Sequence, residues 1–182
     1  MKTKNLFLLS VLIFVNSFTF SQNQNLYENT AEEKVLYDLI MAYRKQFDLP
    51  RIPISRSLNF VAHTHAIDLK NNYKHNDRCN LHSWSNKGNW TACCYTPDHA
   101  NADCVWSKPG ELTNYKHYGF EIAHWNPSGP TASSALNAWK KSPAHKNMII
   151  NKENWSDNEW KAIGIAIYEE YAVVWFGMEP DR

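Results

Sequence analysis

The sequence WKKSPAHKNMII at residues 139–150 carries the clearest structural signal in this chain. Pro143 fits the first turn of a short helix, because a backbone N–H at that position would have no partner within the helix. A second signal, GFEIA, lies upstream at residues 119–123. The two segments contribute one imidazole, from His145, and one carboxylate, from Glu121. A His and a Glu that converge in a cleft can bind a metal ion or move a proton, so the sequence predicts a site that joins these segments.

Two amphipathic helices are predicted near the start of the chain. A capping box formed by Thr30 and Glu33 begins the first helix, and apolar residues recur at helical spacing through residues 31–47. A Leu-Pro turn at residues 49–50 ends it, and Ser57 is expected to cap the second helix. One face of the second helix carries Leu58, Val61, Ala62, His65, Ala66 and Leu69.

The C-terminal third of the chain predicts a third long helix, a short helix and a β-hairpin. Thr131 or Ser133 caps the third helix, and Ser142 caps the short helix that follows it. Runs typical of β-strands occupy residues 162–167 and 172–178, with two glutamates at the turn between them. Helices followed by a hairpin indicate an α+β fold rather than an alternating parallel sheet.

Residues 73–118 lack sustained periodicity, and residues 120–125 after them fit either a short helix or a strand. The irregular segment holds all four cysteines of the chain: Cys79, Cys93, Cys94 and Cys104. An even number in an exported chain predicts two disulfides. Adjacent cysteines seldom pair with each other, so each of the two neighbours is expected to pair with one of the outer two, in an order that stays open. The alternative is a zinc knuckle that uses these thiols with His82 or His99, but the paired C-x-x-C spacing is missing.

Residues 1–21 predict a secretory signal peptide. Lys2 and Lys4 form its positive start, residues 6–20 are mostly apolar, and small residues precede the expected cleavage point before Gln22. The alternative is an uncleaved membrane anchor, which needs about 20 consecutive apolar residues, and this run is shorter and interrupted. We therefore expect a secreted or periplasmic protein without a transmembrane anchor after cleavage.

The mature chain is expected to form one domain. Residues 22–28 are predicted to be a polar leader and residues 29–182 a single domain, with residues 79–104 as a disulfide-stapled insertion. About 160 residues are enough for one compact domain with its own core. Removing the signal peptide takes away two lysines and no acids, so the formal charge moves from +1 to −1. A near-neutral surface argues against nucleic acid or an anionic membrane as the partner.

The order of these motifs resembles the CAP superfamily, which includes the cysteine-rich secretory proteins, antigen 5, the plant pathogenesis-related proteins and bacterial SCP-like domains. Residues 119–123 are similar to the family's Gly-Glu-Asn-Ile-Ala, with an extra Phe before the Glu and no Asn after it. Residues 139–150 are similar to the bacterial Trp-x-x-Ser-Pro-Gly-His-x-x-Asn-Ile-Leu, and residues 163–166 match the first strand of the terminal hairpin. The resemblance implies an α-β-α sandwich of CAP/SCP type with a shallow cleft.

The resemblance also implies a site. In many members two His and two Glu line the cleft, and the His pair can hold zinc or another divalent cation. His145 matches the second His, Glu121 matches the first Glu, and His82 looks like the first His. The place of the second Glu holds Lys141 and Ser142. The resemblance therefore predicts His82 and His145 as metal ligands beside one acid.

Several of these residues have a structural interpretation as well. Glu121 has apolar neighbours, so it would be costly to bury unless paired, and it could instead pin its own segment through backbone hydrogen bonds. His65 lies on the apolar face of the second helix, where a lone His is expected to be a satisfied core group rather than a ligand. The alternative partners for His145 are His75, His99, His117 and His124, and His124 is the first choice among them because a Glu-x-x-His spacing would place it on the same helix face as Glu121. The aromatic residues of the insertion either line a groove or pack around the disulfides; they are Trp84, Trp90, Trp106, Tyr115 and Tyr118.

Three functions remain open. The first is a secreted CAP-domain protein that binds a divalent metal or small ligand through His82 and His145 without turnover. The second is a metal-dependent hydrolase of peptides, esters or cell-wall fragments, with Glu121 as the base. The third is an extracellular interaction module whose cysteine-rich loop recognises a small ligand, a lipid or a surface protein. Whether the protein is an enzyme is left open by the sequence.

Overall fold

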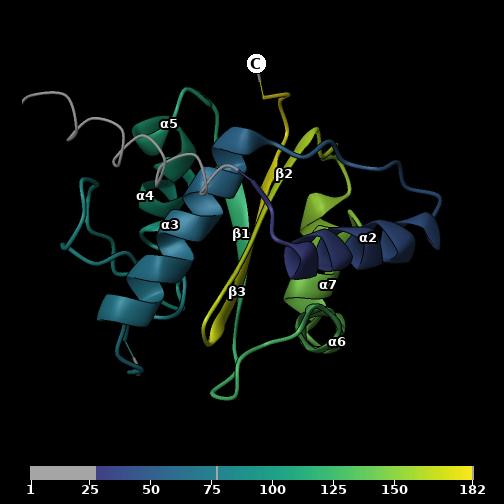
Figure 1. Cartoon of the computed structure of the whole chain (residues 1–182). Helices are drawn as coiled ribbons and strands as arrows, with labels where there is room; N and C mark the ends of the chain where they lie inside the picture. The colour runs from purple at the N-terminus through teal and green to yellow at the C-terminus, as the bar shows by residue number, and fades with distance from the viewer. Residues whose placement is uncertain (1–27, 77, 182) are drawn as a thin grey trace, which may run out of the picture.

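The computed structural model describes residues 28–76 and 78–181. The predicted signal peptide and nearly all of the predicted leader lie outside these residues. A three-stranded antiparallel sheet forms the middle layer, in the order β1–β3–β2 (Figure 1). The strands are β1 (Gly119–Trp125), β2 (Ala162–Tyr168) and β3 (Tyr171–Gly177).

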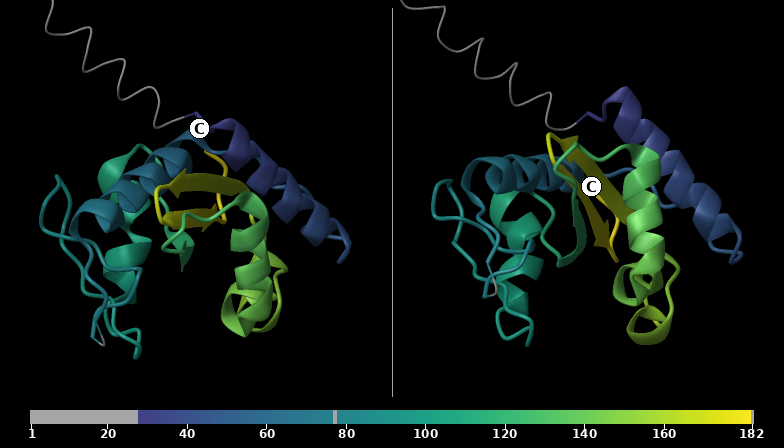
Figure 2. Two further views of the ribbon diagram at one scale, coloured as in Figure 1. Left: turned by 60° about the horizontal axis from the view of Figure 1, so that its bottom comes forward. Right: turned by 90° about the horizontal axis from the view of Figure 1, so that it is seen from below.

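Helices cover both faces of the sheet, as Figures 1 and 2 show. Helix α3 (Arg56–Asn72) packs on one face, with α4 (Ala102–Trp106) and α5 (Lys108–Leu112) on the same side. The other face is covered by α2 (Ala31–Lys45), α6 (Ala132–Lys141) and α7 (Pro143–Ile149), and the short helix η1 (Glu153–Trp155) follows them. This arrangement confirms the α+β class and the α-β-α layers. No helix in the described residues is both long enough and apolar enough to cross a bilayer.

The predicted hairpin is confirmed, because β2 and β3 pair across a two-residue turn at residues 169–170. Residues 120–125, which the sequence left open between helix and strand, belong to β1. This strand pairs with the other side of β3, so that Glu121 lies opposite Trp175. In the described sheet β1 is an edge strand, and its central acid therefore lies near the elements that flank the sheet.

Successive strand residues alternate between two cores, as the pleat of a strand requires. Ile122 of β1 and Val174 of β3 belong to the core under α2 and α6. Their neighbours Ala123 and Val173 belong to the core under α3. Full burial of a Val or Ile side chain contributes about 1.5–3 kcal/mol. The strand register is therefore strongly fixed, because a slip by one residue would exchange the two faces.

Helix α3 approaches the sheet closely at Gly164 of β2. A Cβ atom at this position would lie 2.1 Å from the carbonyl carbon of Leu58 and 2.5 Å from the backbone nitrogen of Asn59. Since side chains never approach backbone so closely, this contact requires glycine. It brings α3, and the histidines that α3 carries, against the middle layer.

The helix boundaries agree with most of the predicted caps and correct one. Thr30 and Glu33 form the predicted capping box, and Thr131, rather than Ser133, caps α6. The prediction that Ser57 caps the second helix is wrong, because Ser55 lies at the cap and accepts a hydrogen bond from the Leu58 N–H at 2.9 Å. The first helix ends at Lys45 and continues as a turn instead of reaching residue 47. Ser142 occupies the cap position of α7 without a capping side-chain bond.

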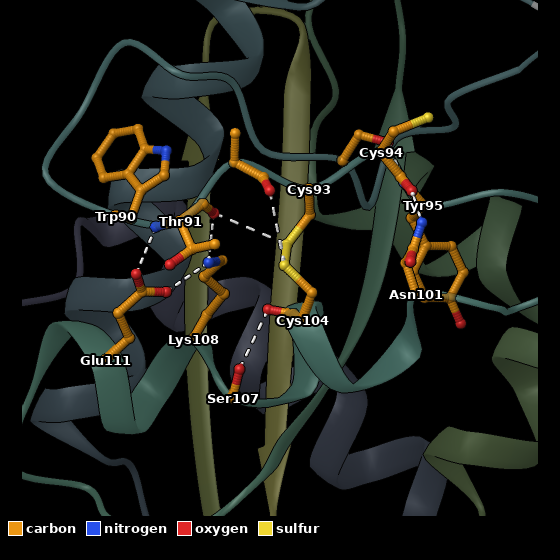
Figure 3. Close-up of a disulfide and its surroundings, with 12 residues drawn as sticks. Trp90, Thr91, Cys93, Cys94, Tyr95, Asn101, Cys104, Ser107, Lys108 and Glu111 are labelled. Carbon is orange, nitrogen blue, oxygen red and sulfur yellow. Dashed lines mark hydrogen bonds and ion pairs between the residues drawn. A yellow bond between two sulfur atoms is a disulfide. The ribbon is translucent and has the colours of Figure 1, made fainter.

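The insertion contains two disulfides, Cys79–Cys94 and Cys93–Cys104. Each of the adjacent cysteines pairs with an outer one, as predicted, and bonded thiols exclude the zinc knuckle. Beside Cys93–Cys104 the buried Lys108 donates from Nζ to the Thr91 carbonyl at 2.6 Å and to Glu111 at 2.5 Å (Figure 3). Trp84 and Tyr115 are buried, whereas Tyr118 is exposed, so packing is the main role of these aromatic side chains.

Candidate functional site

Glu121, in the middle of β1, is the centre of the candidate site. Its side chain is buried, with 1% exposed. Its Oε2 accepts a hydrogen bond from Nδ1 of His65 at 2.5 Å, and its Oε1 accepts one from Nδ1 of His82 at 2.7 Å. Both carboxylate oxygens are therefore bonded to imidazoles, one from α3 and one from the loop that follows α3.

The two imidazoles keep Glu121 ionised. Burial alone would raise the pKa of Glu121, but the charge and hydrogen bond of His65, together with those of His82, outweigh burial and lower the pKa to about 2. This is the expected response of a carboxylate whose charged form accepts hydrogen bonds from cationic donors. At neutral pH Glu121 is a hydrogen-bond acceptor and a poor acceptor of a proton.

His65 is fully buried and contacts three neighbours. Its Nε2 donates to the carbonyl oxygen of Ser83 at 3.1 Å, and its ring stacks on Trp84 with centroids 4.3 Å apart. Burial alone would lower the pKa of His65, but the negative charge of Glu121 outweighs burial and raises it. The expectation that His65 is a satisfied core group is confirmed. The expectation that it lies outside the site is wrong, because its partner is Glu121. The signal was present in the sequence, because a His and a Glu that are each costly to bury can satisfy one another.

His82 lies in the loop that the Cys79–Cys94 disulfide closes, and 21% of its side chain is exposed. Its backbone N–H donates to Oδ1 of Asn80 at 3.0 Å, and its ring lies edge-on to Tyr95 at 5.4 Å. An ionised carboxylate only accepts, so Nδ1 of His82 must carry a proton. When the ring is neutral, the lone pair therefore lies on Nε2, the nitrogen that faces away from Glu121.

His145, in α7, belongs to the same electrostatic neighbourhood. Burial, and then the positive charges of His82 and His124, lower the pKa of His145 to about 4, while Glu121 opposes the shift. His124 lies on β1, and burial also lowers its pKa. Figure 2 shows the insertion and α4 on one side of β1 and α6 and α7 on the other, so His82 and His145 come from opposite sides of this strand. Glu121 and His82 are in direct contact, whereas His145 and His124 are linked to them through the electrostatic effect on the pKa of His145.

The site offers fewer protein ligands than a complete metal coordination shell requires. In residues 28–76 and 78–181, no cluster of three or more His, Cys, Asp or Glu side chains is arranged to hold a metal ion. Glu121 has both oxygens engaged, which leaves His82 and His145 as the matching ligands. Neutral imidazole nitrogens suit zinc and other borderline divalent cations. A metal ion at this place would be held by these two imidazoles, with the other positions filled by water or a ligand.

Comparisons with known proteins bear on the fold. No family model matches the chain, and no curated protein matches it. An outer surface protein of Borrelia burgdorferi aligns over 84% of this chain and 96% of its own, with 24% identity and a TM-score of 0.55. An extracellular protein containing an SCP domain from Bacillus anthracis aligns over 93% of this chain and 45% of its own, with 14% identity and a TM-score of 0.52.

A cysteine-rich secretory protein from Staphylococcus aureus aligns over 84% of this chain and 40% of its own, with 14% identity and a TM-score of 0.53. The matched part is less than half of the Bacillus and Staphylococcus proteins. At these identities the likeness establishes the fold, which is that of the CAP superfamily. The sequence motifs at residues 119–123 and 139–150 predicted this fold, and the structure confirms it.

Proposed function

We propose that this chain is an exported CAP-fold protein that binds a divalent transition metal, such as zinc, or a small metal-coordinating ligand, without turnover. His82 and His145 are the proposed ligands, and Glu121 orients His82. Export is supported by the predicted signal peptide, by the two disulfides and by the names of the similar structures, which are an outer surface, an extracellular and a secretory protein.

The hydrogen bond between Nδ1 of His82 and Glu121 carries this proposal. Metal-binding histidines usually donate their second ring nitrogen to a carboxylate or carbonyl, which fixes the tautomer and makes the ligating nitrogen more basic. Glu121 does this at 2.7 Å, and the low pKa of His145 keeps that imidazole neutral and available at physiological pH. Two ligands leave open positions on the metal, and a small ligand would coordinate there.

Binding is favoured over hydrolysis by the state of Glu121. A general base must accept a proton from water, and a proton on either oxygen of Glu121 would disrupt the hydrogen bond that this oxygen accepts from His65 or His82. A carboxylate with a pKa of about 2 is also poorly matched to proton transfer at neutral pH. The geometry therefore favours a positioning role for Glu121 over a catalytic one.

The test is a calorimetric zinc titration of residues 22–182. We expect one site per chain in the wild-type protein, loss of that site in His82→Ala and His145→Ala, and about 10–100-fold weaker binding in Glu121→Gln. His117→Ala is the matched control, because this exposed histidine lies outside the site. Unchanged binding in His145→Ala would remove that residue from the site.

The hydrolase alternative needs a separate measurement. A panel of peptide, ester and cell-wall substrates should show no turnover above that of the His82→Ala/His145→Ala double variant. Turnover by the wild-type protein that depends on His82 and His145 would overturn the proposal of binding without catalysis. Turnover that also survives Glu121→Gln would exclude Glu121 as the base.

A further inference from the structure

His65 connects the two segments that carry Glu121 and His82. Its Nδ1–H donates to Oε2 of Glu121 at 2.5 Å, and its Nε2–H donates to the carbonyl of Ser83, the residue after His82, at 3.1 Å. Both partners are acceptors, so both ring nitrogens act as donors. The ring is fully buried and stacked on Trp84, which prevents it from turning toward solvent.

The two acceptors that His65 bonds differ in how many other hydrogen bonds hold them in place. The loop after His82 has further anchors, because Asp68 accepts from the backbone N–H of Ser85 at 2.8 Å and from its hydroxyl at 2.5 Å. The Tyr95 N–H also donates to the Ser83 hydroxyl at 2.9 Å. At Oε2 of Glu121, the hydrogen bond found in the described part of the chain is the one from His65. Loss of the Nδ1 donor would therefore free the carboxylate, whereas loss of the Nε2 donor would leave the loop anchored.

We propose that His65 is the positioning residue of this site: by engaging Oε2 of Glu121, it aims Oε1 at Nδ1 of His82 and so selects the His82 tautomer whose lone pair lies on Nε2. Which ring nitrogen of a histidine carries the proton is set by the hydrogen bond that this ring makes. The value of that tautomer for binding rests on the proposed function, but the positioning itself does not require a bound metal.

Two substitutions separate the two hydrogen bonds. The amide nitrogen of Asn lies near the place of the histidine Nδ1, and that of Gln lies near the place of Nε2. His65→Asn therefore keeps a donor for Glu121, and His65→Gln keeps a donor for Ser83. The readout is the pattern of long-range proton–nitrogen correlations of the His82 ring in metal-free protein, at a pH above the ordinary imidazole pKa, with the resonance assigned by its loss in His82→Ala.

We expect the His82 proton on Nδ1 in the wild-type protein and in His65→Asn, and a shift of most of the population to Nε2 in His65→Gln. A folded His65→Gln protein that keeps the proton on Nδ1 would overturn the proposal. Equal shifts in both variants would also overturn it, because they would indicate a packing role. Folding is checked by the near-ultraviolet circular dichroism of the buried tryptophans.

The wild-type protein allows a measurement that needs no substitution. Both ring nitrogens of His65 should carry protons, and both protons should exchange slowly with solvent; a ring with one protonated nitrogen would contradict the geometry. Zinc titration of the same samples keeps the two proposals distinct. If zinc does not bind the wild-type protein but the tautomer follows the variants as expected, the proposed function fails and the positioning role stands.

Discussion

Glu33 of α2 and His63 of α3 form a second buried acid–imidazole pair, with Oε1 and Nε2 2.9 Å apart. The same oxygen of Glu33 accepts the Ile167 N–H of β2 at 2.7 Å, and the other oxygen accepts the Thr30 N–H at 2.7 Å. One carboxylate thus joins the start of α2, the middle of α3 and the sheet. Helix α3 carries both buried pairs, and they connect it to different neighbours.

Glu33 should make the protein sensitive to acid. Burial alone would raise the pKa of Glu33, but the hydrogen bond and charge of His63, with two backbone N–H donors, outweigh burial and lower it. The folded pKa lies below the unfolded value of about 4.3, so this stabilisation is present above that value and is lost as the pH falls through the folded pKa. Glu33→Gln should lower the free energy of unfolding at pH 7 by about 3–5 kcal/mol. Below pH about 4, the free energy of unfolding should fall less steeply with pH in this variant than in the wild-type protein.

Urea unfolding across the acid range measures this effect. Glu28→Gln is the control, because Glu28 faces Arg56 at 3.6 Å with 71% of its side chain exposed, and exposed pairs contribute about 0–1 kcal/mol. If the free energy of unfolding fell equally steeply with pH in the wild-type protein and in Glu33→Gln, Glu33 would not be the source of the acid sensitivity.

The close approach of α3 to the sheet predicts intolerance of a methyl group at Gly164. Gly164→Ala would place Cβ 2.3 Å from the Leu58 carbonyl oxygen, so α3 would have to move away from β2. Overpacking of this kind costs about 1–3 kcal/mol, and more where backbone must shift. Gly110→Ala is the control, because its Cβ would lie 3.5 Å from the Tyr115 carbonyl oxygen, which is an ordinary van der Waals contact. Thermal unfolding should separate the two variants, and equal midpoints would argue against the contact.

Arg44 should hold the C-terminal end of α7, the helix that carries His145. It is buried, and its Nη1 donates to the Ile149 carbonyl and to Oδ1 of Asn151, each at 2.6 Å. Arg44→Leu would leave these two acceptors without a hydrogen-bond donor, which should lower the free energy of unfolding by about 1–3 kcal/mol. Hydrogen exchange at the end of α7 should become faster. Arg51→Leu, at an exposed ion pair, should change stability by less than about 1 kcal/mol. Unchanged exchange at the end of α7 in Arg44→Leu would remove this role.

The Cys93–Cys104 disulfide should stabilise the insertion. It closes a short loop, with a sequence separation of 11, and such a bridge contributes about 2–4 kcal/mol, largely by restricting the unfolded chain. The Cys93→Ser/Cys104→Ser variant should unfold at a correspondingly lower denaturant concentration. Mass spectrometry without reductant provides the check on the wild-type protein, which should weigh four hydrogens less than the reduced chain; four free thiols would contradict both bridges.

Local sequence patterns were enough for most of the fold. The spacing of apolar residues, the capping box at Thr30 and the two β-type runs predicted helices and hairpin, because these features depend on neighbours a few residues away. Boundaries were less certain. Ser55 caps α3 in place of Ser57, since Asp181 near the C-terminus accepts both the Ser55 hydroxyl and the Ser57 N–H. That contact joins residues more than a hundred positions apart, so the local pattern does not contain it.

The sequence predicts most of the residues of the site, but it does not predict which of them form hydrogen bonds with one another. Motifs predict Glu121, His82 and His145, whereas the apolar face of α3 indicates only a core role for His65. Its partner lies 56 positions away, so the local pattern does not contain the pairing. Pairing of the cysteines was open for the same reason. Burial and hydrogen bonding depend on which segments meet in space, and only the packing of α3 and the loop against β1 decides that Glu121 is held between two imidazoles.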